Sequence, residues 1–168
     1  MPGRWMMAAW MFAIAASGCG GTPAALTQQA EARRLASDLR VQFSRAADAA
    51  NRAVIVESDE ASAAAAREAR EATAAVARDV EQLHPLLQSL SYTSELDQLN
   101  TFKARFAEYR ALDNEILPLA VSNPNLESSS VRSLALSLGS KRTVTTACDE
   151  QLRALEEAIG KHDFTATR

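Results

Sequence analysis

The sequence predicts an all-α domain folded as an antiparallel up-down-up-down four-helix bundle. No glycine occurs between Gly21 and Gly139, and the strong helix formers Ala, Leu, Glu, Arg and Gln dominate. No stretch shows the two-residue alternation, bounded by turn residues, that marks a strand. Four amphipathic segments of about 30 residues with short connections make successive helices antiparallel neighbours.

The first helix is expected to begin near Pro23, which is tolerated in a first helical turn. Its apolar face recurs at steps of three and four residues: Leu35, Leu39, Phe43, Ala46, Ala50 and Val54. The branched run Val54–Val56 is poorly helical, and Ser58 or Asp59 can cap a new helix, so the first reversal is placed there. One unbroken helix through Glu57 is the alternative.

The second helix has one apolar face: Ala65, Ala69, Ala72, Val76, Val80, Leu83, Leu87 and Leu90. Its first half is a seam of alanines, which lets the neighbouring helix axis approach closely. Pro85 is expected to kink the last turns and not to stop the helix, because the leucine spacing continues past it. The second reversal is predicted at Ser91–Ser94.

The third helix presents Leu96, Leu99, Phe102, Phe106, Tyr109, Ile116 and Leu119 at helical spacing. Its aromatic rings should fill the middle of the core. Pro118 is expected to kink or end this helix. The third reversal is predicted at Ser122–Asn125, with Asn123 as the cap and Pro124 at the permitted first position of the last helix.

The fourth helix places a further apolar set inward: Val131, Leu134, Leu138, Val144, Cys148, Leu152, Leu155 and Ile159. Gly139 marks a weak point or bend within it, and Gly160 is well placed to end it. The predicted bundle therefore covers residues 23–160, and residues 161–168 are expected to form a flexible tail.

The first 19 residues resemble the leader of bacterial lipoproteins. Arg4 supplies a positive charge, the apolar stretch after it is too short to cross a bilayer as a stable helix, and small residues precede Cys19. The resemblance implies that the thiol of Cys19 receives diacylglycerol and that cleavage falls between Gly18 and Cys19. Residues 1–18 are then a signal peptide, and residues 19–22 are a lipidated tether.

Two other interpretations of the leader stay open: a plain secretory leader cut nearby, and a retained membrane anchor. Gly20, and not Asp, follows Cys19, which by analogy with enteric lipoproteins favours the outer membrane, facing the periplasm. The formal charge of −3 becomes −4 without the leader, because Arg4 is its one charged residue. Such mild acidity gives no reason to expect nucleic acid as a partner.

The second cysteine, Cys148, has no partner within the chain if Cys19 is acylated, so no intrachain disulfide is expected. Cys148 could be a reactive or intermolecular thiol, or a small buried hydrophobe. Its neighbours on the helical face are Val144, Leu152 and Leu155, which favours the buried role.

The remaining chain has no pattern arranged for catalysis: no Gly-x-Ser-x-Gly, no phosphate-binding glycine loop, no paired-cysteine spacing and no His-x-x-x-His. A non-enzymatic protein is therefore predicted. Four-helix bundles often hold haem or metal, and His84 and His162 would lie toward the same end. There is no Cys-x-x-Cys-His motif and no Met outside the leader, so we expect no cofactor and two solvated surface histidines.

Five arginines of the first helix allow two interpretations: Arg33, Arg34, Arg40, Arg45 and Arg52. They could form a site for a carboxylate ligand in a dimer. They could instead form a solvated face with i, i+4 partners and long stems lying over the core, which is the commoner arrangement and the one favoured here.

Two segments carry a resemblance to a known family: Phe102–Arg110 and Leu112–Ala120, followed by Asn123 and Asn125. They resemble the latter half of the four-helix-bundle ligand-binding (sensor) domain of methyl-accepting chemotaxis proteins. The resemblance is loose over residues 23–160 and best over 99–134. It implies an extracytoplasmic sensor bundle, often dimeric, that binds a small molecule or a binding protein and passes a shift through a transmembrane helix.

The chain departs from that family after Gly160, where no apolar span follows. We therefore expect a lipid-anchored, sensor-like or protein-interaction bundle without its own transmembrane signalling region. Its candidate partners are the membrane through the anchor, an envelope protein or small ligand, and a second copy of the chain. The alternative is a structural envelope lipoprotein, a spacer or scaffold with no ligand.

Overall fold

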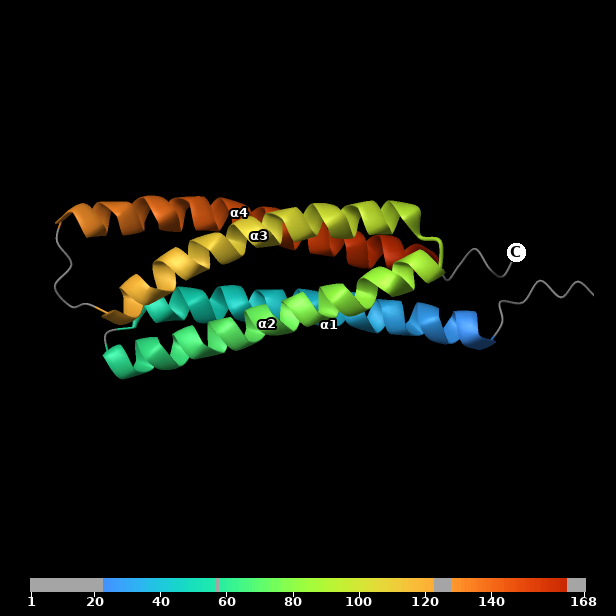
Figure 1. Ribbon diagram of the computed structural model, residues 1–168, viewed down its shortest axis with the longest axis horizontal. Coiled ribbons are helices and arrows are strands. Elements are labelled where there is room, and N and C mark those ends of the chain that lie inside the picture. The colour runs from blue at the N-terminus through green and yellow to red at the C-terminus, as the bar shows by residue number, and fades with distance from the viewer. Residues whose placement is uncertain (1–22, 57, 123–127, 163–168) are drawn as a thin grey trace, which may run out of the picture.

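The computed structural model describes residues 23–56, 58–122 and 128–162, and the side chains of residues 24–56, 58–121 and 138–162. They form four helices: α1 (Pro23–Ile55), α2 (Asp59–Ser89), α3 (Thr93–Ser122) and α4 (Ser128–Lys161). Successive helices run antiparallel and pack side by side (Figure 1). No strand occurs in these ranges, so the predicted all-α four-helix bundle is confirmed.

Different helix ends and connections lie at the two ends of the bundle. The start of α1, the α2–α3 connection and the end of α4 lie together at one end, which we call the terminal end (right in Figure 1). The α1–α2 and α3–α4 connections lie at the opposite end. The short connections predict this arrangement, because each helix reverses the direction of the one before it.

The first reversal lies where the branched residues end α1, at Ile55. Ser58 is the N-cap of α2, and its Oγ accepts a hydrogen bond from the amide of Ala61 at 3.2 Å. Asp59 places a negative charge on the first turn of α2, where the helix dipole favours it. The alternative of one unbroken helix through this region is therefore wrong.

The second reversal is a Schellman motif. Tyr92 donates its amide to the carbonyl of Leu87 at 2.9 Å, and Ser91 donates to Gln88 at 3.0 Å. Ser91 adopts a φ of 58°, the left-handed conformation that glycine most often supplies at this place. The reversal begins after Ser89 and α3 begins at Thr93, in agreement with the predicted position.

The two prolines inside helices do not end them. Pro85 lies within α2, which continues to Ser89 as predicted. Pro118 lies within α3, which continues to Ser122. The predicted third reversal falls largely on 123–127, outside the described residues, and α4 is described from Ser128 onward. The predicted core side chains of Val131 and Leu134 also lie outside the described part of the chain.

Toward the terminal end the core is built from leucines and aromatic rings. The ring of Phe43 meets Phe102 and Tyr109 edge-on, with centroids 5.9 and 5.2 Å apart. The largest fully buried side chains here come from all four helices: Leu35, Leu39, Leu83, Leu87, Leu99, Leu152, Leu155 and Ile159. The predicted apolar faces are thus confirmed for most of their length.

Toward the opposite end the core is built from alanines, which bring α1 and α2 close together: Ala49, Ala50, Ala53, Ala65, Ala66 and Ala69. This confirms the predicted alanine seam. Ser62 lies in the seam, 3% exposed, with its Oγ 2.6 Å from the carbonyl of Ala53 and 3.1 Å from that of Ala120. The hydroxyl thereby connects α1, α2 and α3.

A few details of the predicted faces and ends differ. Leu117 is buried where Leu119 was predicted, and Leu119 is half-buried. Gly160 does not end α4, which runs to Lys161. Of the predicted tail, residues 163–168 lie outside the described residues.

Candidate functional site

The predicted lipidation and cleavage site, Gly18 and Cys19, lies with the rest of the leader and the tether among residues 1–22, outside the described residues. It stays a prediction from the sequence. The site described below is therefore sought in the bundle itself.

A buried charged pair lies in the middle of the bundle. Asp113 of α3 is 4% exposed and Lys141 of α4 is 3% exposed, and the lysine Nζ forms an ion pair with Oδ1 of the aspartate. On α3, Asp113 follows Tyr109 by one turn and precedes Leu117 by one turn. Because Tyr109 belongs to the aromatic cluster and Leu117 to the alanine cluster, the pair separates the two parts of the core.

The polar atoms of this layer are poorly satisfied. Lys141 Nζ lies 5.2 Å from the centre of the Tyr109 ring, within cation–π range. Within the described chain, Lys141 Nζ and the Asp113 carboxylate are in ion-pair contact without an aligned hydrogen bond, and the Tyr109 hydroxyl lies close to Asp113. Burial, followed by the nearby Asp113 charge, raises the pKa of Tyr109 well above its usual range.

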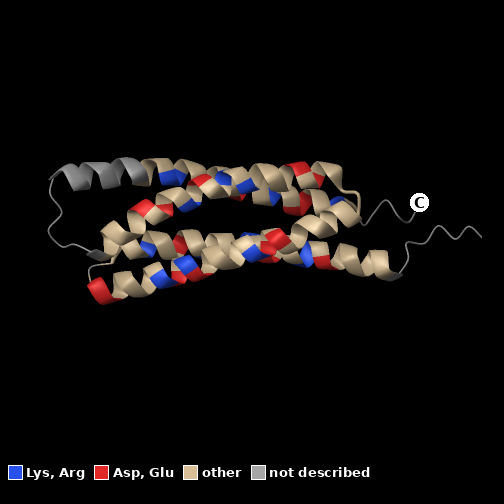
Figure 2. Cartoon of the chain, viewed as in Figure 1, with Lys and Arg blue, Asp and Glu red and all other residues tan. Residues whose placement is uncertain are grey.

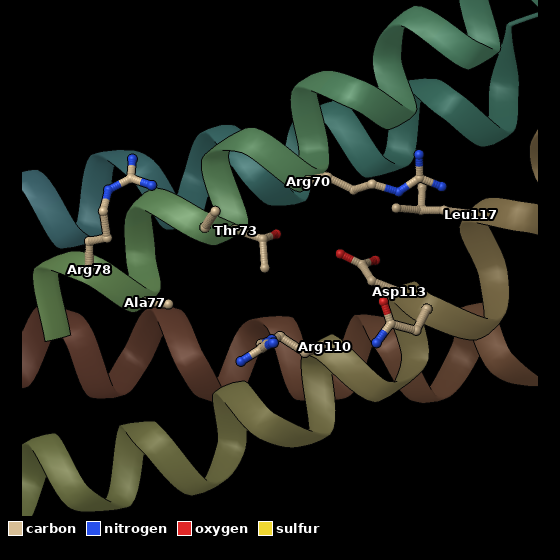
Figure 3. A pocket seen from close by; sticks show the side chains of 9 residues that line it. Arg70, Thr73, Ala77, Arg78, Arg110, Asp113 and Leu117 are labelled. Atoms are coloured by element: carbon tan, nitrogen blue, oxygen red, sulfur yellow. The ribbon is translucent and has the colours of Figure 1, made fainter. Parts of the chain in front are cut away.

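A buried ion pair with few hydrogen bonds is costly to desolvate, so this layer is a functional candidate. Asp113 also lines a groove of about 430 Å³ between α2 and α3 (Figure 3). The other lining residues are Arg70, Thr73, Ala74, Ala77, Arg78, Arg110, Asn114 and Leu117. Figure 3 shows the Asp113 carboxylate extending from α3 toward Thr73 of α2.

Three arginines, Arg70, Arg78 and Arg110, surround the groove, and all three are exposed. In the described part of the chain no hydrogen bond or ion pair engages any of their guanidinium groups. In Figure 3, Arg110 lies beside Asp113, Arg70 extends along α2 toward Leu117, and Arg78 points away from the groove. Arg70 and Arg110 are therefore the cations best placed to meet a bound anion.

The groove continues toward the terminal end. Ala77 and Arg110 also line an adjoining hollow of about 160 Å³, together with Val80, Phe106 and Ala107 and the ion-paired Glu81 and Lys103. The shared residues make one channel between α2 and α3, with charged groups and apolar side chains along its wall. Such a mixture of apolar surface and a few placed polar groups is typical of small-molecule sites.

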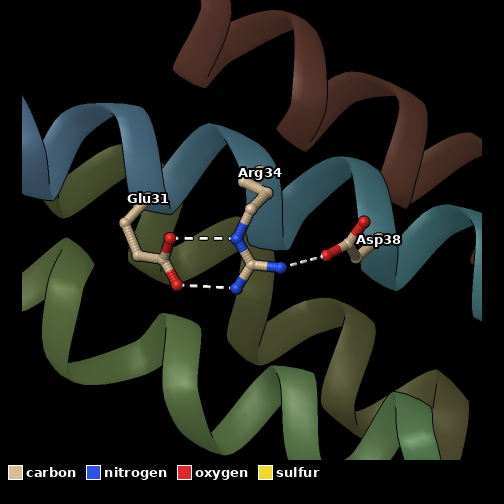
Figure 4. Close-up of polar contacts among 3 residues, drawn as sticks. All are labelled: Glu31, Arg34 and Asp38. Carbon is tan, nitrogen blue, oxygen red and sulfur yellow. Dashed lines mark hydrogen bonds and ion pairs between the residues drawn. The ribbon is translucent and has the colours of Figure 1, made fainter.

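The five arginines of α1 have partners within the chain. Arg34 pairs with Glu31 at 2.6 Å and with Asp38 at 2.5 Å (Figure 4). Arg40 pairs with Glu156, Arg45 and Arg52 share Glu68, and Arg33 donates to the carbonyl of Gly160. Figure 2 shows acidic and basic residues interspersed along the helices. Only Arg34 has the predicted i, i+4 partner, and the other four arginines contact neighbouring helices, so all five already have partners within the described chain.

His162 was predicted to be a solvated surface histidine, and that prediction is wrong. Its ring stacks on Tyr92 with centroids 3.7 Å apart, and its Nε2 lies 2.8 Å from Oε1 of the buried Glu95. The reason is that α4 extends past Gly160 and brings His162 against the α2–α3 connection. His84, half-buried on α2, takes no part in this cluster. Within the described ranges no three His, Cys, Asp or Glu side chains come together as metal ligands would.

Cys148 is fully buried in the core, as the favoured interpretation predicted. Burial, and then the nearby Glu108 charge, raises the pKa of its thiol to about 12. The thiolate is the reactive form, so we expect Cys148 to be inert toward a disulfide reagent at pH 8 while the protein is folded, and to react at once in denaturant. Titration with Ellman's reagent measures this. Rapid modification of the folded protein would contradict the buried position.

Comparison with known protein families, curated proteins and solved structures finds no match to this chain. The four helices described are each too polar to act as a membrane-spanning segment. The functional argument therefore depends on the chemistry of the bundle itself.

The residues of the groove were not singled out from the sequence, although one signal was present. The apolar spacing of α3 skips from Tyr109 to Ile116, and that of α4 skips from Leu138 to Val144. Asp113 and Lys141 occupy the two gaps with opposite charges. Two gaps of this kind on neighbouring helices indicate a buried ion pair.

Proposed function

We propose that this protein is a lipid-anchored, non-catalytic sensor-like module that binds a small organic anion in the groove between α2 and α3. The observation that carries the proposal is the contrast among the arginines. Those of α1 have partners, whereas Arg70 and Arg110 face a groove without one in the described chain. Guanidinium groups bind carboxylate and phosphate groups through two parallel hydrogen bonds.

The groove favours an anion with an apolar body. The charge of Asp113 is offset by Lys141, so Arg70 and Arg110 leave the groove positive. Ala74, Ala77 and Leu117 offer apolar surface to the rest of the ligand. Asn114 adds an amide that can donate to an oxyanion.

The cellular setting in this proposal comes from the leader. Cys19 would anchor the chain at the outer membrane, facing the periplasm, and the tether would let the terminal end of the bundle lie nearest the bilayer. The resemblance to chemotaxis sensor domains supports a sensing role, and an envelope protein partner would transmit the signal. No cofactor and no nucleic acid are part of this proposal.

Thermal unfolding of the full chain, purified from membranes in detergent, tests whether the protein binds such an anion. A panel of small carboxylates and organic phosphates is added, and helicity is followed by circular dichroism. A ligand at 100 times its Kd adds about 2.7 kcal/mol of stability, a shift of about 5–10 °C for a domain of this size. The double variant Arg70→Gln/Arg110→Gln should lose the shift, and Arg67→Gln, an exposed arginine outside the groove, should keep it. A panel without any shift contradicts the proposal.

One observation favours the structural alternative, a spacer that associates with itself. Leu26, Val41 and Ile55 of α1 are exposed by 56%, 61% and 75%. At about 100° per residue they fall within about 60° of one another around the helix, so they share its outer face. Sedimentation of the wild type and of Val41→Lys distinguishes the functions. A dimer abolished by Val41→Lys, with no bound anion, would favour the spacer.

A further inference from the structure

A second groove lies between α1 and α4, with a volume of about 330 Å³. Its lining residues are Asn51, Leu138, Lys141, Arg142, Thr145 and Thr146. All but Leu138 are polar, and no carboxylate lines it. The nearest acidic residue on α1 is Asp48, one turn before Asn51. The groove therefore differs from the α2–α3 groove, which Asp113 lines.

Several donors of this groove lack acceptors. The buried Lys141 ammonium faces Asp113 on one side and has no aligned hydrogen bond in the described chain. Neither the exposed guanidinium of Arg142 nor the half-buried hydroxyl of Thr145 makes a hydrogen bond there. The Thr146 hydroxyl donates its hydrogen to the carbonyl of Arg142 at 3.1 Å, so it has no donor left for a ligand. An ammonium, a guanidinium and a hydroxyl thus surround one polar hollow.

We infer that the α1–α4 groove is a second binding site, specific for a small oxyanion of the phosphate or sulfate class. A guanidinium and a hydroxyl without acceptors in the described chain are features that recognise such an ion. The volume admits a compact oxyanion. Arg142 and Thr145 bind the anion directly, whereas the charge of Lys141 below the groove is offset by Asp113. The negative charge of Asp48 on α1 weakens the attraction of the groove for the anion.

The oxyanion would come from solution and not from a lipid headgroup. Twenty residues of α4 separate Lys141 from Lys161, a distance of about 30 Å. Lys161 lies at the terminal end, where the predicted anchor would hold the chain to the bilayer. The groove is therefore out of reach of the headgroups around the anchor.

Calorimetric titration of inorganic phosphate into the full chain tests this site. We expect saturable binding of one phosphate that weakens at least tenfold in Arg142→Gln and several-fold in Thr145→Val. Arg67→Gln makes the same charge change away from the groove and should bind as the wild type does. Asp48→Asn should tighten binding.

The role of Lys141 must be tested in a variant that keeps the fold, because Lys141→Met alone leaves the Asp113 carboxylate buried without its counter-charge. The double variant Asp113→Leu/Lys141→Met removes the ion pair without changing the net charge and should bind phosphate nearly as the wild type does. An equal loss in Arg142→Gln and Arg67→Gln, or the absence of any binding, would overturn the assignment. Loss of phosphate binding in Arg110→Gln but not in Arg142→Gln would also overturn the assignment of the α1–α4 groove, and it would leave the proposed α2–α3 site standing. If the wild type binds phosphatidylglycerol vesicles and Arg142→Gln does not, the claim that the oxyanion comes from solution would be overturned.

Discussion

Replacing Lys141 with Met is expected to lower the free energy of unfolding by about 3–5 kcal/mol, because it leaves the buried Asp113 carboxylate without its counter-charge. Asp113→Leu should lower the free energy of unfolding by a comparable amount, because it leaves the Lys141 ammonium buried without a counter-charge. Urea unfolding followed by circular dichroism at 222 nm measures the change. A loss of this size is large for one bundle of this length, whose total stability is on the order of 5–15 kcal/mol.

The matched control is the double variant Asp113→Leu/Lys141→Met. Replacing a buried ion pair by apolar side chains of similar volume is often neutral or stabilising by about 1–4 kcal/mol. We therefore expect the double variant to unfold at a urea concentration equal to or above that of the wild type. If Lys141→Met alone costs less than about 1 kcal/mol, or if the double variant is as weak as the single ones, the two charges are not paired in the core.

Replacing Cys19 with Ser is expected to abolish stable attachment to the membrane while leaving the bundle folded. Lipid transfer requires the thiol, and residues 19–22 precede the first helix, which begins at Pro23. Attachment by acyl chains depends on about 0.8 kcal/mol per buried methylene, so two or more chains hold a protein without help from a basic surface. Fractionation of cells and mass spectrometry of the mature amino terminus measure the effect.

Cys148→Ser is the control for the lipid anchor, because Cys148 is buried in the bundle and cannot carry the lipid. That variant should fractionate with the membrane as the wild type does. An unmodified Cys19 in the mature wild type, or a mature chain that starts elsewhere, would contradict the lipidation. Membrane attachment of the Cys19→Ser variant would favour a retained membrane anchor.

The sequence was sufficient to predict the helices, because their signals are local. Apolar spacing placed Leu35, Phe43 and Leu152 in the core, and the branched run before Ser58 marked the first reversal. Such features depend on residues within a few turns of one another. The ends of helices were less accurate: Gly160 was expected to stop α4, but a glycine inside a helix costs only about 1 kcal/mol and does not by itself end it.

The candidate sites could not be predicted because they depend on how the helices face one another. Asp113 and Lys141 appear separately as gaps in two apolar faces, and nothing local shows that they meet. Whether an arginine forms an ion pair likewise depends on the neighbouring helix: Arg45 pairs with Glu68 of α2, whereas Glu81 of α2, which lines the channel with Arg110, pairs with Lys103. His162 found Tyr92 and Glu95 only because α4 ends beside the second reversal.

The α2–α3 groove is tested most directly by calorimetric titration of the full chain with the organic anion that gives the largest thermal shift. We predict one binding site per chain, with affinity lowered about tenfold or more in Arg110→Gln and unchanged in Arg67→Gln, since a charge-assisted hydrogen bond contributes about 1.5–3 kcal/mol. Equal affinity in the wild type and in Arg110→Gln, or equal losses in both arginine variants, would contradict a ligand bound between α2 and α3.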